Sequence, residues 1–400
     1  MNILFLSGLF PHNKRTEIIE NSKGVIQYAA NSLQWSFVKG FDNFSKTNLI
    51  SSPFIGSFPF FFKKIYLSSE KFEHISGADD ISLSVINIPI VKHFFIYRKV
   101  KNEIKKRLKT KNEEIIIVIY SVHSPFLKAA RDVKKQFPNI KICLIVPDLP
   151  EFMSDSTNFF YKVLKKLDSL IIKKCLNEVD SFVLLTDNMA EPLGVNQKQW
   201  VRIEGIFDPS HDNSIPVIKD KFKTILYTGT LAKRYGIKNL VQAFRLIKSN
   251  SYRLYIAGEG DFREDIEHIS SIDKRIHYLG QIPHNEILIL QKKATVLINP
   301  RTSEGTYTKY SFPSKTLEYL ASGTPTILYR LAGIPEEYYQ YCFIPFDEEI
   351  KSLQEIIIRV CEKPIEELDN FGARAKNFVL ENKNPKSQIR KVYEMLSAIK

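Results

Sequence analysis

The chain has 400 residues, of which 44% are hydrophobic, and a formal net charge of +13. This length and apolar content predict two globular domains. They exclude a membrane-spanning helix, because no run of about 18 apolar residues occurs. The first residues, MNILFLSGLFPHNK, lack the basic region and cleavage site of a signal peptide. The positive charge suits an anionic substrate or lipid surface, while no zinc-finger or RNA-recognition signature indicates nucleic acid.

The first half alternates β-rich apolar runs with helical patterns. The predicted strands are 2–7, 47–51, 81–87, 114–121, 141–146, 181–186 and 201–206. The predicted helices are 25–39, 98–109, 125–136 and 158–177. The unbroken apolar runs IIIVIY and ICLIV are typical of parallel strands covered on both faces. The first half is therefore expected to form a doubly wound α/β domain.

Three segments of the first half suit a membrane interface. Segments 98–111 and 161–176 alternate basic and apolar residues at helical spacing, and 54–66 (FIGSFPFFFKKIY) joins aromatic residues to two lysines. Aromatic side chains flanked by cations are typical of interfacial contact. The alternatives are solvated helix faces for the basic segments and a buried strand or helix for the aromatic one, and they are the commoner cases.

The second half begins after a polar, proline-containing linker at 207–222. Its predicted strands are 224–228, 253–257, 275–279, 295–299, 326–328 and 342–345. Its predicted helices are 236–248, 263–270, 285–293, 313–322 and 353–361. We expect domains at 1–207 and 208–384, with an amphipathic helix at 385–400 packing back on the first. Two such domains imply a cleft between them, with ligands at the carboxyl ends of the strands.

The stretch 303–325, SEGTYTKYSFPSKTLEYLASGTP, carries the clearest candidate site. Lys315 falls in the first turn of the predicted helix, where a cation opposes the helix dipole at a cost of roughly 0.3–1 kcal/mol. An anion held at that helix end would explain it. One turn on, Glu318 offers acceptors for vicinal hydroxyls such as those of ribose, and Ser311 lies on the same stripe. The alternative is a surface helix with a solvated lysine and glutamate.

Other strands of the second half also end in residues that suit a nucleotide. Gly229 and Thr230 follow 224–228, where a missing side chain lets a phosphate approach backbone N–H groups, and Arg234 follows to clamp it. Glu259 lies in Gly-Glu-Gly after 253–257; this is not the GxGxxG fingerprint. Ile282, after 275–279, is a candidate to flank a flat base.

Four stretches resemble, in order, the nucleotide-binding domain of GT-B retaining glycosyltransferases of family 4, the glycosyl transferases group 1. They are ILYTGTLAKRYGIKNLVQAF, YIAGEG, YLGQIPHNEI and SFPSKTLEYLASGTPTI. The resemblance implies two Rossmann-like domains whose parallel sheets face an interdomain cleft. It also implies a nucleotide sugar, with UDP as the expected nucleotide, as donor and hexosyl transfer with retention and without metal or cofactor. No Asp-x-Asp motif occurs.

The chain departs from the family pattern at two places. The family's two glutamates have seven residues between them; Glu318 fits the second, which binds ribose, and counting back gives Tyr310. Glu304, in Ser-Glu-Gly, resembles the first in context, and we favour it as acceptor of a sugar hydroxyl. The family's Arg and Lys after the first strand turn are replaced by Thr230 and Tyr235. Arg234 and Lys315 are the candidates to supply that charge.

The first half offers three further candidates by resemblance. Gly8, in Ser-Gly-Leu-Phe-Pro, resembles the family's glycine loop near the donor phosphate and the acceptor. His123 resembles the family's His-x-x-Pro-like strand end, and Asp148 stands where many members carry a histidine near the donor sugar. His123, Asp148 and Glu304 are thus the candidate catalytic residues. The alternatives are a structural histidine for His123 and a helix N-cap for Asp148.

The function implied by the resemblance is transfer of a sugar to a glycan or polyprenyl-linked acceptor in surface polysaccharide assembly. We expect a cytoplasmic enzyme at the inner face of the cell membrane, since the four cysteines form no CxxC pair and are expected to be reduced. One alternative is a non-hydrolysing sugar-nucleotide epimerase, which shares the two-domain fold. Another is a catalytically silent nucleotide-sugar-binding subunit of a transferase complex, which the missing Arg/Lys pair would favour.

Overall fold

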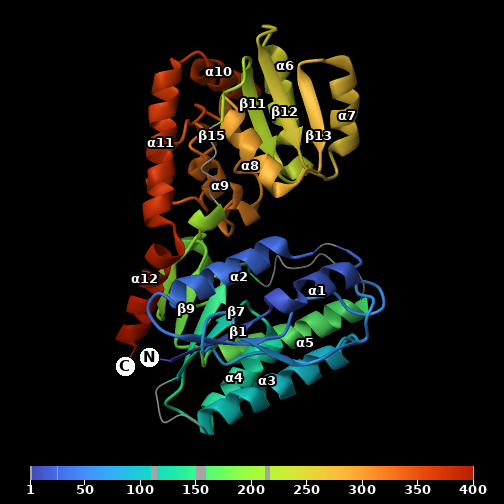
Figure 1. Cartoon of the computed structure of the whole chain (residues 1–400), viewed down its shortest axis with the longest axis vertical. Coiled ribbons are helices and arrows are strands. Elements are labelled where there is room, and N and C mark those ends of the chain that lie inside the picture. Colours follow the sequence, from blue (N-terminus) through green and yellow to red (C-terminus); the bar gives the residue numbers. More distant parts are fainter. Residues whose placement is uncertain (1, 25, 110–114, 150–158, 212–216, 400) are drawn as a thin grey trace. The chain divides into compact units, whose positions relative to one another are not determined.

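The computed structural model describes residues 2–24, 26–109, 115–149, 159–211 and 217–399. The chain divides into two compact units (Figure 1). Unit 1 comprises Met1–Ile206 and Pro385–Lys400, and unit 2 comprises Phe207–Asn384. No helix in the described ranges combines the length and apolar character needed to cross a bilayer. All four cysteines are free and buried.

Unit 1 is built on an eight-stranded sheet in the order β10-β9-β8-β7-β1-β2-β5-β4. All neighbours pair in parallel except β4, which is an antiparallel edge strand. The strands are β1 Asn2–Ser7, β2 Thr47–Ser51, β4 Glu70–Phe72, β5 Asp80–Ser82, β7 Ile115–Tyr120, β8 Lys141–Val146, β9 Ser181–Leu184 and β10 Gln199–Arg202. Strands β2 and β7 are buried along their whole length, which confirms the prediction of a sheet covered on both faces.

Helices cover both faces of this sheet: α2 lies on one side and α3, α4 and α5 on the other (Figure 1). The helices of unit 1 are α1 Arg15–Asn21, α2 Tyr28–Phe41, α3 Val91–Lys109, α4 Ser124–Lys134, α5 Phe159–Leu176 and α12 Pro385–Ala398. The last of these packs directly on α2, since a Cβ placed on Gly40 would lie 2.1 Å from Cγ1 of Ile389. Ile389, Val392 and Leu396 complete a core shared with the sheet.

Two predictions for unit 1 are wrong in detail. The single strand expected at 81–87 is broken into β5 and β6 (Val85–Ile86), and β6 pairs antiparallel with β3 (Tyr66–Leu67) in a separate ribbon. Segment 54–66 is neither a buried strand nor a buried helix. It is a surface loop leading into β3, in which Phe62 is buried while Phe60 and Phe61 are 75% and 60% exposed. Helix and strand propensities could not predict which of these phenylalanines is buried. In an irregular loop that is held by backbone hydrogen bonds, the burial of successive side chains follows no regular period.

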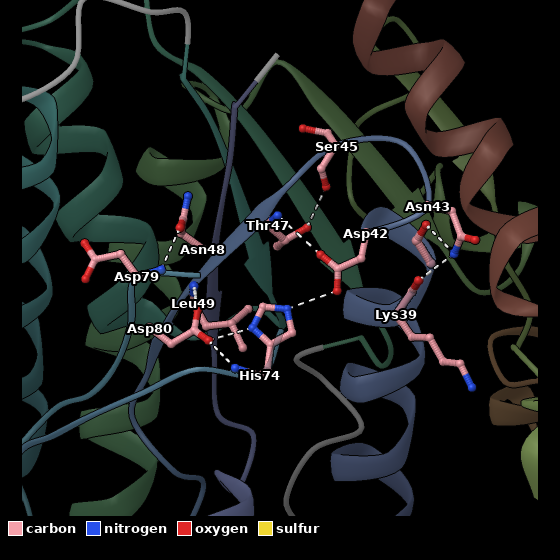
Figure 2. Close-up of polar contacts among 11 residues, drawn as sticks. Lys39, Asp42, Asn43, Ser45, Thr47, Asn48, Leu49, His74, Asp79 and Asp80 are labelled. Carbon is pink, nitrogen blue, oxygen red and sulfur yellow. Dashed lines mark hydrogen bonds and ion pairs between the residues drawn. The ribbon is translucent and has the colours of Figure 1, made fainter. Parts of the chain in front are cut away.

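A histidine whose side chain is buried, His74, joins three elements of unit 1 (Figure 2). Nδ1 of His74 lies 2.6 Å from Oδ2 of Asp80, at the start of β5, and its Nε2 lies 3.0 Å from Oδ2 of Asp42, just after α2. The same carboxylates accept the N–H groups of Leu49 and Thr47 on β2. Burial disfavours the charged imidazolium, but the hydrogen bonds to both aspartates outweigh burial and raise the pKa of His74 to about 9.

Unit 2 has a five-stranded parallel sheet in the order β13-β12-β11-β14-β15. The strands are β11 Lys223–Thr228, β12 Tyr252–Ala257, β13 Ile276–Gly280, β14 Val296–Asn299 and β15 Thr326–Leu328. The helices are α6 Ile237–Leu246, α7 Arg263–Ile272, α8 His284–Lys293, α9 Lys315–Ser322, α10 Ile350–Cys361 and α11 Ile365–Asn382. Apolar residues of the inner strands pack with those of α6 and α10 in one core.

Unit 2 differs from the prediction at its C-terminal end. The strand expected at 342–345 is reduced to a single bridge between Phe343 and Ile327. Helix α11 was not among the predicted helices, and it contains Gly372, a residue that is unfavourable inside a helix. The structure gives that glycine a reason: a Cβ there would lie 1.8 Å from the carbonyl oxygen of Gly323, where α9 ends. Glycine thus allows α11 to pack against the end of α9.

Candidate functional site

At the carboxyl ends of β11, β12 and β13, glycines bring the backbones of neighbouring strands into direct contact. The N–H of Gly229 donates to Ala257 O at 3.0 Å, and the N–H of Gly258 donates to Gly280 O at 2.9 Å. A Cβ on Gly258 would lie 1.8 Å from Gly229 O, so glycine is required at this approach. Because the Gly229 amide is already engaged, an anion at this turn would meet the amide of exposed Thr230 instead.

Lys315 and Glu318 lie together at the start of α9. Nζ of Lys315 is 2.7 Å from Oε1 of Glu318, and the same oxygen accepts from Nε2 of Gln291 on α8 at 2.6 Å. Oε2 of Glu318 faces Nδ1 of His284 at a longer distance, 3.9 Å. Both side chains of the pair are partly exposed, 33% for Lys315 and 17% for Glu318. The side chain of Lys315 is therefore neither fully exposed to solvent nor fully buried.

This pair is fixed to the end of β11 by a hydrogen-bond network. Gln291 Nε2 also donates to Thr228 Oγ1 at 3.3 Å. The buried hydroxyl of Tyr319, next to Glu318 on α9, accepts from the N–H of Thr228 at 2.8 Å and donates to its carbonyl oxygen at 3.0 Å. The carboxylate of Glu318 is thus oriented by two helices and the central strand, which is what a ligand-binding carboxylate requires.

Two arginines share a pair of tyrosine rings nearby. The guanidinium carbon of Arg301, after β14, lies 5.2 Å from the ring centre of Tyr235 and 4.6 Å from that of Tyr307. Arg234 lies over the same rings at 5.2 and 5.6 Å. Arg301 is buried and donates through Nη2 to Ser311 Oγ at 2.7 Å. Its Nε is buried with no partner among the described residues. We call these four residues the arginine–tyrosine cluster.

The remaining predicted residues of unit 2 are less closely joined. The carboxylate of Glu259 pairs with Arg263 on α7 at 3.3 Å, while its carbonyl oxygen accepts from the N–H of Leu231. Ile282 is half-buried just before α8. Glu304 is exposed and, within the described ranges, makes no polar contact with Glu318 or the arginine–tyrosine cluster. Tyr310, the alternative to Glu304, is half-buried.

In unit 1 the glycine loop is closed by protein atoms. The N–H of Gly8 donates to Oε1 of Gln34 at 2.8 Å, and a Cβ there would lie 2.2 Å from the ring of Phe54. His123 precedes α4, and burial, with Lys92 and His93 nearby, lowers its pKa to about 3. Asp148 follows β8 with an exposed side chain, although the protein atoms around its carboxyl group raise its pKa. The alternative of a helix N-cap at Asp148 depends on residues 150–158, which lie outside the described ranges.

Sequence reasoning missed three residues of this region. Arg301 carried a signal in the sequence, since it follows a strand of the second half just as Arg234 does. Gln291 and Tyr319 carried no such signal, because each is an ordinary residue of a predicted helix. Their role in holding Glu318 and α9 at the end of β11 appears only when α8 and α9 pack on that strand.

A known family model matches almost the whole of unit 2. Residues 211–378 match the family model described as "Glycosyl transferases group 1". Unit 2 is a group 1 glycosyltransferase domain. Glu318, Lys315 and the arginine–tyrosine cluster all lie within the matched range of this group 1 domain.

Two curated relatives share part of their sequence with this chain. The O-antigen chain mannosyltransferase RfbU of Salmonella typhimurium is 24% identical over 235 residues, which cover 58% of this chain and 62% of that protein. The O-antigen chain mannosyltransferase B of Escherichia coli is 27% identical over 120 residues, which cover 28% of this chain and 29% of that protein. The chain therefore matches less than two thirds of the length of either relative.

Solved structures share the fold over nearly the whole chain. The sucrose-phosphate synthase of Thermosynechococcus elongatus has a TM-score of 0.64 at 16% identity, and the trehalose-6-phosphate synthase OtsA has 0.68 at 11% identity; both cover 100% of this chain and 100% of their own. At such identities the likeness shows the fold alone. The predicted α/β GT-B architecture with parallel sheets is confirmed, while the interdomain cleft and the roles of the site residues remain predictions.

Proposed function

We propose that the chain is a glycosyltransferase that moves a hexosyl group from a nucleoside diphosphate sugar to a glycan or lipid-linked acceptor. The observation that carries this proposal is the position of Glu318, a carboxylate that Gln291 and Lys315 hold beside the end of β11 within the group 1 domain. The names of the two relatives support a role in O-antigen or similar polysaccharide assembly.

The donor is proposed to lie along the carboxyl ends of β11, β13 and β14. Glu318 accepts the ribose hydroxyls, and Ile282 flanks the base. Arg301, Arg234 and Lys315 surround the diphosphate, with Ser311 holding Arg301 in place. Glu304 accepts a hydroxyl of the donor sugar. Lys315 must then exchange Glu318 for a phosphate oxygen, which is a small movement for a flexible ammonium group.

The chemistry follows from the leaving group. Departure of a nucleoside diphosphate places negative charge on phosphate oxygens, and fixed cations and N–H groups stabilise that charge without a metal ion. We propose that the acceptor hydroxyl attacks from the face that the diphosphate leaves, which retains the anomeric configuration. The leaving phosphate oxygen then takes the proton of that hydroxyl. His123 and Asp148 are proposed to contact the acceptor or donor sugar from unit 1.

We also propose that the enzyme acts in the cytoplasm, at the anionic inner surface of a membrane. Phe60, Phe61 and Phe94 are 75%, 60% and 60% exposed, which is unusual for large aromatic side chains. The segments that carry them, 54–67 and 83–102, contain no acidic residue and include several lysines and an arginine. Aromatic and basic side chains together favour an anionic lipid interface.

A panel of nucleotide sugars tests the donor. Thermal stability should rise with one UDP-sugar or, because both relatives are named mannosyltransferases, with GDP-mannose. Product analysis with that donor should then show transfer only when an acceptor is added. Conversion of the donor without acceptor would indicate the epimerase instead, and tight donor binding with no turnover on lipid-linked or glycan acceptors would indicate a silent subunit.

A further inference from the structure

Unit 1 contains a cavity of about 660 Å³ at the carboxyl ends of β2 and β7. Most of its wall is apolar and comes from Phe10, Ile26, Pro53, Phe54, Ile55, Phe61 and Ile96. Phe10 and Ile96 are each 2% exposed, whereas Phe61 is 60% exposed. The cavity thus runs from the edge of the sheet to the surface, and its volume lies in the range of small-molecule sites.

A cation without a counter-ion lies in the wall of this cavity. Lys92 on α3 is 9% exposed, and its Nζ donates to the carbonyl oxygen of Ile55 at 2.6 Å. No carboxylate within the described ranges pairs with it, and burial lowers the pKa of Lys92 to about 8. A buried ammonium is costly unless an anion accompanies it. An anionic group entering the cavity would supply that partner.

Two further polar atoms in the same wall are unsatisfied. Nδ1 of His123 and Oγ of Ser52 are buried and have no hydrogen-bond partner among the described residues. Ser52 directly follows β2, and His123 lies three residues after β7, so both belong to the carboxyl ends of strands. Buried polar groups normally find a partner, so these atoms and Lys92 together mark a polar inner end, opposite the apolar mouth at Phe61.

The mouth of the cavity continues into an exposed apolar surface. Two segments form it side by side: the N–H of Phe58 donates to Asn87 O at 2.9 Å, and the N–H of Asn87 donates to Ile65 O at 2.7 Å. The exposed side chains on these segments are Phe60, Phe61, Ile65, Tyr66, Ile88, Ile90, Val91 and Phe94. An apolar chain leaving the cavity past Phe61 would therefore stay in contact with apolar side chains.

We infer that this cavity binds a single amphiphile, with an anionic phosphate head at Lys92, His123 and Ser52 and a hydrocarbon chain that leaves past Phe61. Binding itself requires only unit 1. That the amphiphile is the lipid carrier of the sugar acceptor rests on the proposed function. The proposed acceptor would then present its phosphate to unit 1 and its hydrocarbon to the membrane surface.

Calorimetric titration of the full-length protein with octyl phosphate, inorganic phosphate and 1-octanol tests the inference. Octyl phosphate should bind at least about tenfold more tightly than either partial probe, because only it fills both ends of the cavity. Equal affinity for inorganic phosphate would overturn the hydrocarbon half, and equal affinity for octanol would overturn the anion half. Failure of octyl phosphate to bind would overturn the whole.

Matched variants locate the binding. Lys92→Met should weaken octyl phosphate by about 10- to 100-fold while Lys106→Met, an exposed lysine on the same helix, should leave it unchanged. Phe61→Asp should weaken it, and Phe346→Asp, an exposed phenylalanine of unit 2, should not. Loss in all four variants, or in none, would contradict the assignment. Phosphate also suits the donor site of unit 2, so the difference between parent and Lys92→Met is the readout.

The test is independent of sugar transfer. A protein that transfers sugar but ignores octyl phosphate would overturn this inference and leave the proposed function standing. One that binds octyl phosphate through Lys92 but transfers no sugar would overturn the proposed function and leave the cavity assignment standing.

Discussion

The ammonium of Lys315 and the carboxylate of Glu318 are 2.7 Å apart, three residues from each other on the first turn of α9. The carboxylate neutralises a cation that would otherwise oppose the positive end of the helix dipole. The two residues expected to bind phosphate and ribose thus hold each other in the absence of a nucleotide. Binding has to separate them, so each should affect the affinity in a different way.

Lys315→Ala is expected to weaken a nucleoside diphosphate by about 10- to 100-fold, because a charged hydrogen bond to phosphate is lost. Binding of the nucleoside alone should change little. Calorimetric titration of both ligands measures the difference, with Lys238→Ala, an exposed lysine on α6, as control. An equal loss for nucleoside and diphosphate would exclude the phosphate role.

Glu318→Gln is expected to weaken both nucleoside and diphosphate by about tenfold or more, because a carboxylate that accepts ribose hydroxyls is lost. The substitution keeps the shape, so the unfolding temperature should stay close to the parent value. Glu355→Gln on α10, which is exposed, is the control. If nucleotide affinity is unchanged in Glu318→Gln, that residue does not contact the ligand.

Arg301→Lys tests the arginine–tyrosine cluster. Lysine keeps the charge but loses the planar fork that stacks on Tyr235 and Tyr307 and donates to Ser311. We expect a loss of diphosphate affinity of about tenfold, measured beside Arg359→Lys, an exposed arginine on α10. An affinity equal to that of the parent would show that the planar guanidinium is not needed: either the positive charge of Arg301 is sufficient, or Arg301 does not contact the donor.

Gly258→Ala and Gly280→Ala separate steric contact from backbone strain. Both glycines have positive φ, 143° and 66°. A methyl group at Gly258 would lie 1.8 Å from Gly229 O, whereas none of the described atoms lies within 4 Å of one at Gly280. We expect Gly280→Ala to cost about 1–2 kcal/mol and Gly258→Ala to cost clearly more, measured by urea unfolding. Equal costs would show that the two strand ends can move apart freely.

The His74 cluster predicts a pH dependence of stability. Its folded pKa, about 9, is raised above the ordinary value of 6.5, so the protonated form is stabilised in the folded protein. This contribution is full below about pH 6.5 and is lost as pH rises through 9. The free energy of unfolding of the parent minus that of His74→Gln should therefore fall between pH 6.5 and 9.5. A difference that is constant over this range would contradict a charged His74 between Asp42 and Asp80.

The regular elements were largely predictable because they depend on local pattern. The buried runs of β7 and β8 and the amphipathic repeats of α4, α6 and α10 lie within a few residues of their predicted positions. Elements decided by distant contacts were missed. Helix α11 was not predicted, and only its packing on the carbonyl of Gly323 explains the glycine at 372. Strand β6 was predicted as part of one strand with β5, because its partner β3 lies in an aromatic segment with no strand pattern.

The candidate site divides in the same way. Glu318, Lys315 and Arg234 could be chosen from strand and helix ends along the chain. Arg301, Gln291 and Tyr319 could not be ranked without the sheet order that brings β14 and α8 beside β11. The cavity of unit 1 was beyond sequence reasoning, because its wall combines single residues from several loops and one face of α3.

The return of α12 to the first unit has a consequence for synthesis on the ribosome. Ile389, Val392 and Leu396 complete the core of unit 1, yet they are translated after every residue of unit 2. Unit 2 is contiguous and can fold as it emerges, while unit 1 must wait with α2 uncovered until the last helix arrives. A premature stop codon before Pro385 should therefore yield a protein whose second unit is folded. Its first unit should be incompletely folded, and proteases and chaperones should recognise it.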